Sequence, residues 1–155
     1  MNIPKTPLMK NWQYIADQTF INKLMFIDWQ AIFLRLVSSN EGSKFTLSQA
    51  ILAIEQYGLL LHLISKYPHK KMIPNEEMDV VLHAHIANTE QFEKDCINLF
   101  ETKLVHVAEV GTKAEGRQEW LLAFAQTHSL FQRNFGQDAI ASSIPACCEL
   151  LLRFT

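Results

Sequence analysis

The chain contains few charged residues, and this shortage excludes one large class of partner. Charged side chains make up 19% of its 155 residues, against roughly 25% in an ordinary soluble domain. The 14 basic and 16 acidic residues give a formal net charge of -2 with histidine neutral. Nucleic-acid binding needs an excess of lysine and arginine to neutralise phosphates. We therefore expect no nucleic-acid partner.

Glycine and proline are also scarce, at five residues each. Such a chain lacks the closely spaced turn signals of an all-β protein. Its hydrophobic content of 48% is too high for a disordered chain, which combines few apolar residues with a high net charge. These proportions predict a single compact all-α domain over residues 1–155.

Cysteine is limited to Cys96, Cys147 and Cys148, and no C-x-x-C pair is present. An odd, unevenly spaced set does not make a disulfide framework, so a reducing compartment is expected. The first ten residues are not followed by the apolar segment and small-residue cleavage site of a secretory signal. These absences predict a cytoplasmic protein and leave export by a specialised secretion system open.

Two segments, residues 20–37 and 47–67, are apolar enough to raise the question of a membrane span. The first contains Asp28 and Arg35, and the second contains Glu55 and Lys66. Charges near the centre of a bilayer are costly, so a spanning helix rarely carries them. We expect no membrane span and interpret both segments as buried helices.

The apolar pattern and the helix signals predict a bundle of five to seven helices. One helix is expected over residues 17–37, closed by Gly42, and another from Thr46 to just before Pro68, with Gln49 completing a capping box. The second is apolar almost all round, which is typical of the central helix of a bundle. Further helices are expected after Pro74, after a pause at residues 88–89, over residues 119–135, and as a final turn or helix over residues 145–154.

Three details of this prediction concern single segments. The helix over residues 119–135 is expected to bury one stripe, made of Leu121, Phe124, His128, Phe131 and Phe135. Cys147 and Cys148 are interpreted as part of a buried helix start after Pro145, with a metal-binding or redox-sensitive pair as the alternative. Residues 103–107 are expected to be a short apolar segment, followed by an exposed loop over residues 109–117.

The segment between Asp79 and His106 holds the side chains best suited to chemistry. Asp79 and His83 are four residues apart on the expected helix, so their side chains can touch. His85 lies about 200° around the helix from His83 and faces another direction. Downstream, Cys96 and His106 add a thiol and a further imidazole.

Three interpretations of this set stay open. Two imidazoles and a carboxylate compose an open zinc site or a non-haem iron triad, with His83, His106 and Asp79 as ligands of a divalent metal. The spacing matches no strong metal motif such as H-E-x-x-H, which favours a buried hydrogen-bonded pair of Asp79 and His83 without a ligand. The third interpretation is a metal-free acid–base pair, in which Asp79 tunes His83 toward neutral pH.

The same region resembles a known family. The run Asp79-Val80-Val81-Leu82-His83-Ala84-His85-Ile86 is followed by Thr89, Phe92, Asp95-Cys96 and His106. This order is similar to the signature of the glycine-rich domain-containing protein-like family of plants and bacteria, over about residues 72–136. Leu82 stands where that family usually has tryptophan, and the glycine-rich tail of its longer plant members is lacking. The resemblance implies that Asp79, His83, His85, Cys96 and His106 act as a set, without naming a reaction.

These observations predict a small helical protein with a pocket centred on histidine and aspartate. The pocket would bind a divalent metal, zinc or iron, or a small ligand. His83, His106 and Asp79 would be the ligands, and His85 and Cys96 would line the site. The competing interpretation is a non-enzymatic interaction module, in which the cluster is structural and an exposed apolar face binds a protein partner or a second copy of the chain.

Overall fold

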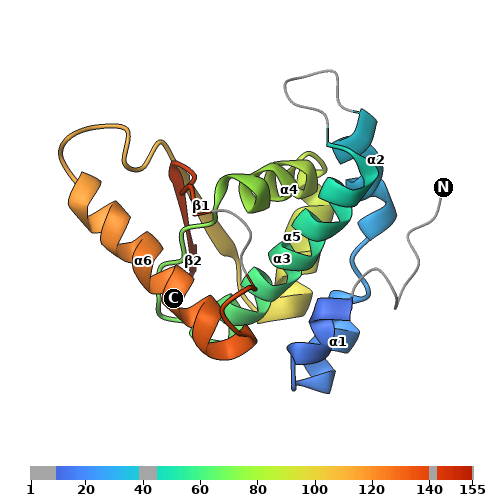
Figure 1. Ribbon diagram of the computed structural model, residues 1–155. Helices are drawn as coiled ribbons and strands as arrows, with labels where there is room; N and C mark the ends of the chain where they lie inside the picture. Colours follow the sequence, from blue (N-terminus) through green and yellow to red (C-terminus); the bar gives the residue numbers. More distant parts are fainter. Residues whose placement is uncertain (1–9, 39–44, 140–142, 155) are drawn as a thin grey trace.

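The computed structural model describes residues 10–38, 45–139 and 143–154. This part of the chain forms a short 3₁₀ helix, six α-helices and two β-strands (Figure 1). They are η1 (Lys10–Tyr14), α1 (Gln18–Leu24), α2 (Trp29–Ser38), α3 (Leu47–Lys66), α4 (Glu76–Ile86), α5 (Thr89–Phe100), β1 (Leu104–Ala108), α6 (Arg117–Phe135) and β2 (Cys148–Leu152). The predicted fold class and number of helices are confirmed, with a two-stranded sheet added. The expected cap at Gly42 lies outside the described residues.

Helix α3 is the centre of the fold, as its apolar composition predicts. Helices α2, α4, α6 and η1 all pack against it. The predicted capping box is present, because the Thr46 hydroxyl accepts from the Gln49 N–H and the Gln49 side chain accepts from the Thr46 N–H. Among the described helices, α3 alone has the length and composition to cross a bilayer, and 67% of its most apolar 18-residue window is buried. This burial is typical of a core helix.

Gly58 lets η1 approach α3 closely. A Cβ atom at this position would lie 2.4 Å from the indole of Trp12, well inside van der Waals contact. The Trp12 indole N–H donates to the backbone carbonyl of Glu55 at 2.9 Å. Packing at this point therefore depends on the missing side chain of Gly58.

The single helix expected over residues 17–37 is wrong. The chain forms α1 and α2 with a break over residues 25–28. The Trp29 indole N–H donates to the Leu24 carbonyl at 2.9 Å, which satisfies a backbone acceptor at the end of α1. Asp28 accepts from the Ala31 N–H at 3.1 Å and so caps the start of α2. Apolar residues run through the break, so periodicity alone does not reveal it.

Helices α4 and α5 begin close to the predicted points, each at an asparagine. The Asn75 side chain accepts from the Met78 N–H, and the Asn88 side chain accepts from the Gln91 N–H. Short polar side chains at these positions satisfy N–H groups that have no partner within the helix. The two caps fix where α4 begins and where it gives way to α5.

The final turn or helix predicted after Pro145 is wrong. Residues Cys148–Leu152 form β2, which pairs antiparallel with β1. Side chains alternate across a strand, so Cys148, Leu150 and Leu152 are buried while Cys147 is exposed. Cys147 is therefore not part of a buried helix start. Figure 1 shows the two strands between α6 and the other helices.

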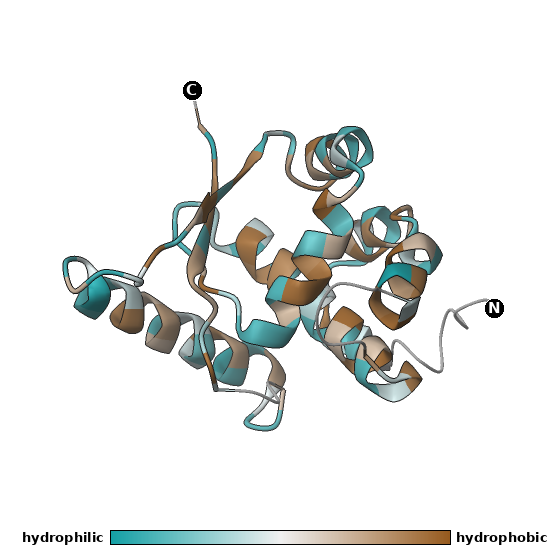
Figure 2. Cartoon of the chain, turned by 90° about the horizontal axis from the view of Figure 1, so that it is seen from above, coloured by the Kyte–Doolittle hydropathy of each residue, from teal (hydrophilic) through white to brown (hydrophobic). Residues whose placement is uncertain are grey.

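Helix α6 covers the outer side of the fold with a stripe that differs slightly from the predicted one. Phe124, Phe131 and Phe135 are buried as expected, whereas Leu121 is 44% exposed. The stripe begins one residue earlier, at Trp120, whose indole N–H donates to the Ala146 carbonyl at 3.0 Å. Thr127 and Leu130 are buried as well, and His128 is half-buried. In Figure 2 this long helix carries both hydrophobic and hydrophilic residues.

Candidate metal centre

Helix α4 presents its two histidines to opposite environments. His83 is on the same side as Asp79, one helical turn away, and its side chain is 60% exposed. His85 is 3% exposed and points into the core. Neighbours two positions apart on a helix are separated by about 200°, as the sequence predicts. The two histidines therefore belong to two different clusters.

The outer cluster joins α4 to the hairpin of β1 and β2. Asp79, His106 and Cys148 each offer a ligand atom, and these atoms all lie within 4.8 Å of one another. The Cys148 thiol donates to Asp79 Oδ1 at 3.2 Å. His83 Nε2 lies 3.4 Å from the same oxygen, and its ring meets that of His106 edge to face at 5.4 Å. A carboxylate, a thiol and two imidazoles thus converge from three elements.

The register of the hairpin explains why His106 and Cys148 share this cluster. Ala108 pairs with Cys148, and His106 pairs with Leu150. Residues two apart on a strand lie on the same face, and directly paired residues do as well. His106 and Cys148 therefore both face α4. His106 pairs with Leu150, which is two residues along β2 from Cys148.

His106 has a buried nitrogen that the described residues leave without a partner. Its Nε2 atom is inaccessible to solvent and makes no hydrogen bond with any of them. An uncompensated buried polar atom costs free energy, so most such atoms in proteins are paired. This atom belongs to the same residue that contributes a ligand atom to the cluster.

Burial shifts the pKa values of His106 and Cys148 in this cluster. It lowers the pKa of His106, and nearby His83 lowers that pKa further while Asp79 opposes the change. Burial also raises the pKa of the Cys148 thiol far above its ordinary value, and the Asp79 carboxylate adds to this effect. Near neutral pH, the imidazole of His106 is therefore neutral and the Cys148 thiol keeps its proton.

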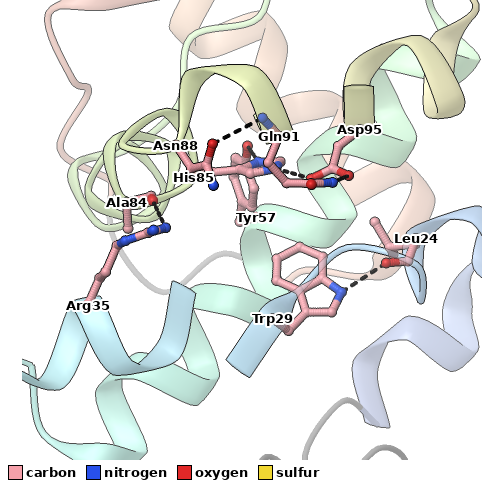
Figure 3. Close-up of polar contacts among 9 residues, drawn as sticks. All are labelled: Leu24, Trp29, Arg35, Tyr57, Ala84, His85, Asn88, Gln91 and Asp95. Atoms are coloured by element: carbon pink, nitrogen blue, oxygen red, sulfur yellow. Dashed lines mark hydrogen bonds and ion pairs between the residues drawn. The ribbon is translucent and has the colours of Figure 1, made fainter. Parts of the chain in front are cut away.

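The inner cluster, around His85, is a linear series of buried hydrogen bonds (Figure 3). Tyr57 on α3 lies with its hydroxyl 2.8 Å from His85 Nδ1, and His85 Nε2 lies 2.8 Å from Asp95 Oδ2 on α5. The Gln91 side-chain amide donates to the other oxygen of Asp95 at 2.9 Å. Both nitrogens of His85 are engaged in the core, so its position links three helices and does not reach the outer cluster.

Cys96 is separate from both sets of ligand atoms. It is 1% exposed, and burial followed by the charge of Asp95 raises the pKa of its thiol to about 12. It lines a cavity that His106 also lines. Of the five residues singled out from the sequence, the structure brings Asp79, His83 and His106 together and places His85 and Cys96 elsewhere.

The sequence does not connect Cys148 with Asp79 and His106, and it does not reveal Tyr57 as the partner of His85. The favoured interpretation places Cys148 in a helix start, although the alternation of its segment, Cys148-Glu149-Leu150-Leu151-Leu152, is compatible with a strand. Tyr57 lies on the apolar face of α3 and carries no local signal. The interpretation of Asp79 and His83 as a buried pair does not fit, because their side chains are 25% and 60% exposed.

Comparison of the chain with protein-family models, with curated proteins and with solved structures finds no match. The resemblance to the glycine-rich domain-containing protein-like family therefore stays a prediction.

Proposed function

We propose that this protein binds a zinc ion through Asp79, His106 and Cys148. The observation that carries the proposal is the convergence of three different donor atoms, from α4, β1 and β2, within 4.8 Å of one another. The buried, unpartnered Nε2 of His106 supports it. A cation bound through this nitrogen would compensate a buried polar atom that the described residues leave without a partner.

The donor set favours zinc over harder cations. Thiolate and imidazole ligands suit zinc, whereas magnesium and calcium prefer oxygen ligands. Bond lengths of about 2.0–2.3 Å put the donors of a tetrahedral zinc site on the order of 3.5 Å apart. Small side-chain rotations are enough to bring donors within 4.8 Å to this spacing. Three protein ligands leave one position of the tetrahedron for water or another ligand.

His83 has a supporting position in this proposal. Its Nε2 lies 3.4 Å from the Asp79 carboxylate, at the exposed edge of the cluster. A partner that holds a ligating carboxylate orients it, and loss of such a partner typically weakens metal binding by about 10–100-fold. The sequence prediction made His83 a ligand, and the alternative set of His83, His106 and Asp79 would suit iron.

The family resemblance is part of the proposal and adds one expectation. If the chain is related to the glycine-rich domain-containing protein-like family, Asp79, His83 and His106 are expected to act together there as well. His85 and Cys96 then contribute from behind the cluster, His85 by fixing α4 and Cys96 by lining the adjoining cavity.

Adjacent Cys147 and Cys148 provide the matched pair for a test. The full chain, prepared without a histidine tag, is titrated with Zn²⁺ and with Co²⁺, and bound metal is measured by elemental analysis. We expect one equivalent of zinc, and a sulfur-to-cobalt charge-transfer absorption with Co²⁺. Cys148→Ser should remove that absorption and weaken zinc binding at least about tenfold, while Cys147→Ser, at an exposed position, should change neither.

Three results would contradict the proposal. The first is substoichiometric zinc that His106→Gln and Cys148→Ser leave unchanged. The second is equal zinc affinity and equal cobalt absorption of Cys148→Ser and Cys147→Ser. The third is stoichiometric iron that needs His83 and is indifferent to Cys148, which would identify the alternative ligand set. Circular dichroism of each variant shows whether it retains the fold.

A protein partner or a second copy of the chain is a second candidate, supported by the hairpin. Val105 and Val107 are 36% and 41% exposed on β1, the strand that forms one side of the two-stranded sheet. Exposed apolar strands favour pairing with another chain. Sedimentation of the wild type and of Val107→Lys tests this, since a dimer formed there should dissociate in the variant.

A further inference from the structure

A cavity of about 210 Å³ lies between α5 and β1, and His106 is part of its lining. Phe92 and Cys96 form its wall on α5, Leu104 and His106 form its wall on β1, and Ile86 closes it from the end of α4. Phe92, Cys96 and Leu104 are at most 8% exposed. The apolar half of the lining, formed by Ile86, Phe92, Cys96 and Leu104, thus belongs to α4, α5 and β1.

The size of the cavity limits what it can hold. An apolar cavity of about 150 Å³ accommodates benzene, so about 210 Å³ accommodates one ring with a small substituent. The wall is preformed, because the Phe92 ring packs edge to face against His85 at 4.8 Å and His85 is anchored by two hydrogen bonds. Cys96 presents a neutral thiol, since its pKa is about 12. A neutral molecule with little polar surface is therefore favoured.

Four polar residues line the cavity. Thr89, Glu93 and Lys103 are exposed and mark where it opens to solvent. His106 is the one half-buried polar residue of the lining and contributes a ligand atom to the cluster with Asp79 and Cys148. A ligand in the cavity thus has one direction toward water and one toward His106.

We infer that this cavity binds a small neutral molecule, one ring in size, whose single oxygen substituent meets His106 and the ion held beside it. The orientation of the oxygen rests on the proposed zinc site. Occupation of the cavity rests only on its volume and lining. Asp79 and Cys148 do not line the cavity, so such a ligand would meet the ion only beside the His106 ring.

Phenol and toluene are suitable probes because they have nearly the same shape and differ in one polar group. Both are titrated into isotope-labelled full-length protein, with and without one equivalent of Zn²⁺, and binding is followed by methyl and ring resonances of Ile86, Leu104 and Phe92. We expect both probes to shift these resonances. Phenol should bind at least about tenfold more tightly with zinc than without it, whereas toluene should be indifferent to zinc.

Filling the cavity provides the control. Cys96→Met adds volume at the wall and should reduce binding of both probes at least about tenfold while leaving zinc stoichiometry unchanged. Cys147→Met adds the same atoms at an exposed position and should change neither. Where Cys96→Met fails to fold, Cys96→Val, which adds one heavy atom at the same wall, should weaken binding of both probes to a smaller extent. Intermolecular nuclear Overhauser contacts of the bound probes with Phe92 and Leu104 provide the second measurement.

The outcomes separate this inference from the zinc proposal. Binding of neither probe near these resonances, up to their solubility limits, overturns the inference whatever the metal content. Phenol with its hydroxyl toward Glu93 and Lys103, or with no gain from zinc in zinc-loaded protein, overturns the orientation. If the protein takes up no zinc, the zinc proposal fails, and toluene contacts to Phe92 and Leu104 still decide whether the cavity is a binding site.

Discussion

His83 and His85 show how two positions on one helix produce different chemistry. His83 is largely exposed beside Asp79, whereas His85 has both nitrogens engaged between Tyr57 and Asp95. In the core, each partner removed leaves a buried polar atom without compensation. At the surface, water replaces a lost partner at little cost.

Replacement of Tyr57 by phenylalanine should destabilise the protein. The change keeps the ring and removes only the hydroxyl that meets His85 Nδ1. Leaving that nitrogen unsatisfied in the core should lower the free energy of unfolding by about 1–3 kcal/mol. Urea unfolding measures the change. Tyr14→Phe, at a tyrosine that is 54% exposed, should change the free energy by less than about 0.5 kcal/mol, and an equal effect of both variants would contradict this account of Tyr57.

Zinc affinity should rise steeply with pH. Burial raises the pKa of the Cys148 thiol, so the metal-free protein carries the proton that the bound thiolate must lose. Release of one proton increases the observed affinity about tenfold per pH unit. His106 contributes little to this slope near neutral pH, because burial lowers its pKa and leaves it already neutral. Zinc titrations between pH 6 and 8 give the slope, and Cys148→Ser should flatten it.

The elements differ in how far the sequence could predict them. Helices α3, α4 and α5 carry caps within a few residues of their starts, at Thr46, Asn75 and Asn88, and their predicted starts are close to the observed ones. The break between α1 and α2 depends on the Trp29 side chain reaching back to Leu24. That contact is set by tertiary packing, which the apolar pattern does not express.

The hairpin was harder to predict because its two strands are far apart in the chain. The segments Leu104–Ala108 and Cys148–Leu152 are short apolar runs, and such runs do not distinguish a strand from a buried helix end. Helix α6 separates them. The pairing of Asp79 with His83 follows from helix spacing alone, whereas the inclusion of His106 and Cys148 required the hairpin and its register.

Two glycines with the same backbone conformation test packing around the loop before α6. Gly111 and Gly116 both have a φ of +81°, but a Cβ on Gly111 would lie 2.3 Å from the Trp120 ring, while one on Gly116 would meet nothing within 4 Å. Gly116→Ala should cost about 1–2 kcal/mol from the left-handed backbone. Gly111→Ala should cost a further 1–3 kcal/mol, roughly, from overpacking. Thermal or urea unfolding of both variants gives the difference. Equal losses in the free energy of unfolding would show that the Trp120 side chain moves aside without measurable cost.

At the scale of the whole molecule, the stability of the metal-free protein should decline in mild acid. Burial lowers the pKa of His62 from 6.5, Lys66 lowers it further, and Asp17 opposes them. His62 lies between Phe20 and Phe135, where its ring packs at 5.3 Å and 6.1 Å from theirs. As the pH falls, His62 is therefore protonated at a higher pH in the unfolded chain than in the folded protein. The stability that neutral His62 contributes is complete above pH 6.5 and is lost as the pH falls through the lower pKa of the folded state.

Urea unfolding in the presence of a chelator, between pH 5.0 and 7.5, measures this decline. His62→Gln removes the titrating group and should make the free energy of unfolding less dependent on pH over this interval. His69→Gln, at an exposed histidine, provides the control and should retain the wild-type dependence. A pH profile that His62→Gln leaves unchanged would assign the decline to other groups.

The pairing register of β2 has a consequence for the two adjacent cysteines. A slip of one residue turns every side chain of a strand to the opposite face, so it would turn Cys148 away from Asp79 and bring Cys147 to the inner side of the hairpin. A thiol would remain available in either alignment. The same slip would bury Glu149 and expose Leu150, which is 0% exposed in the observed register. Burial of Leu150 therefore selects the register, and this register places Cys148, rather than Cys147, beside Asp79.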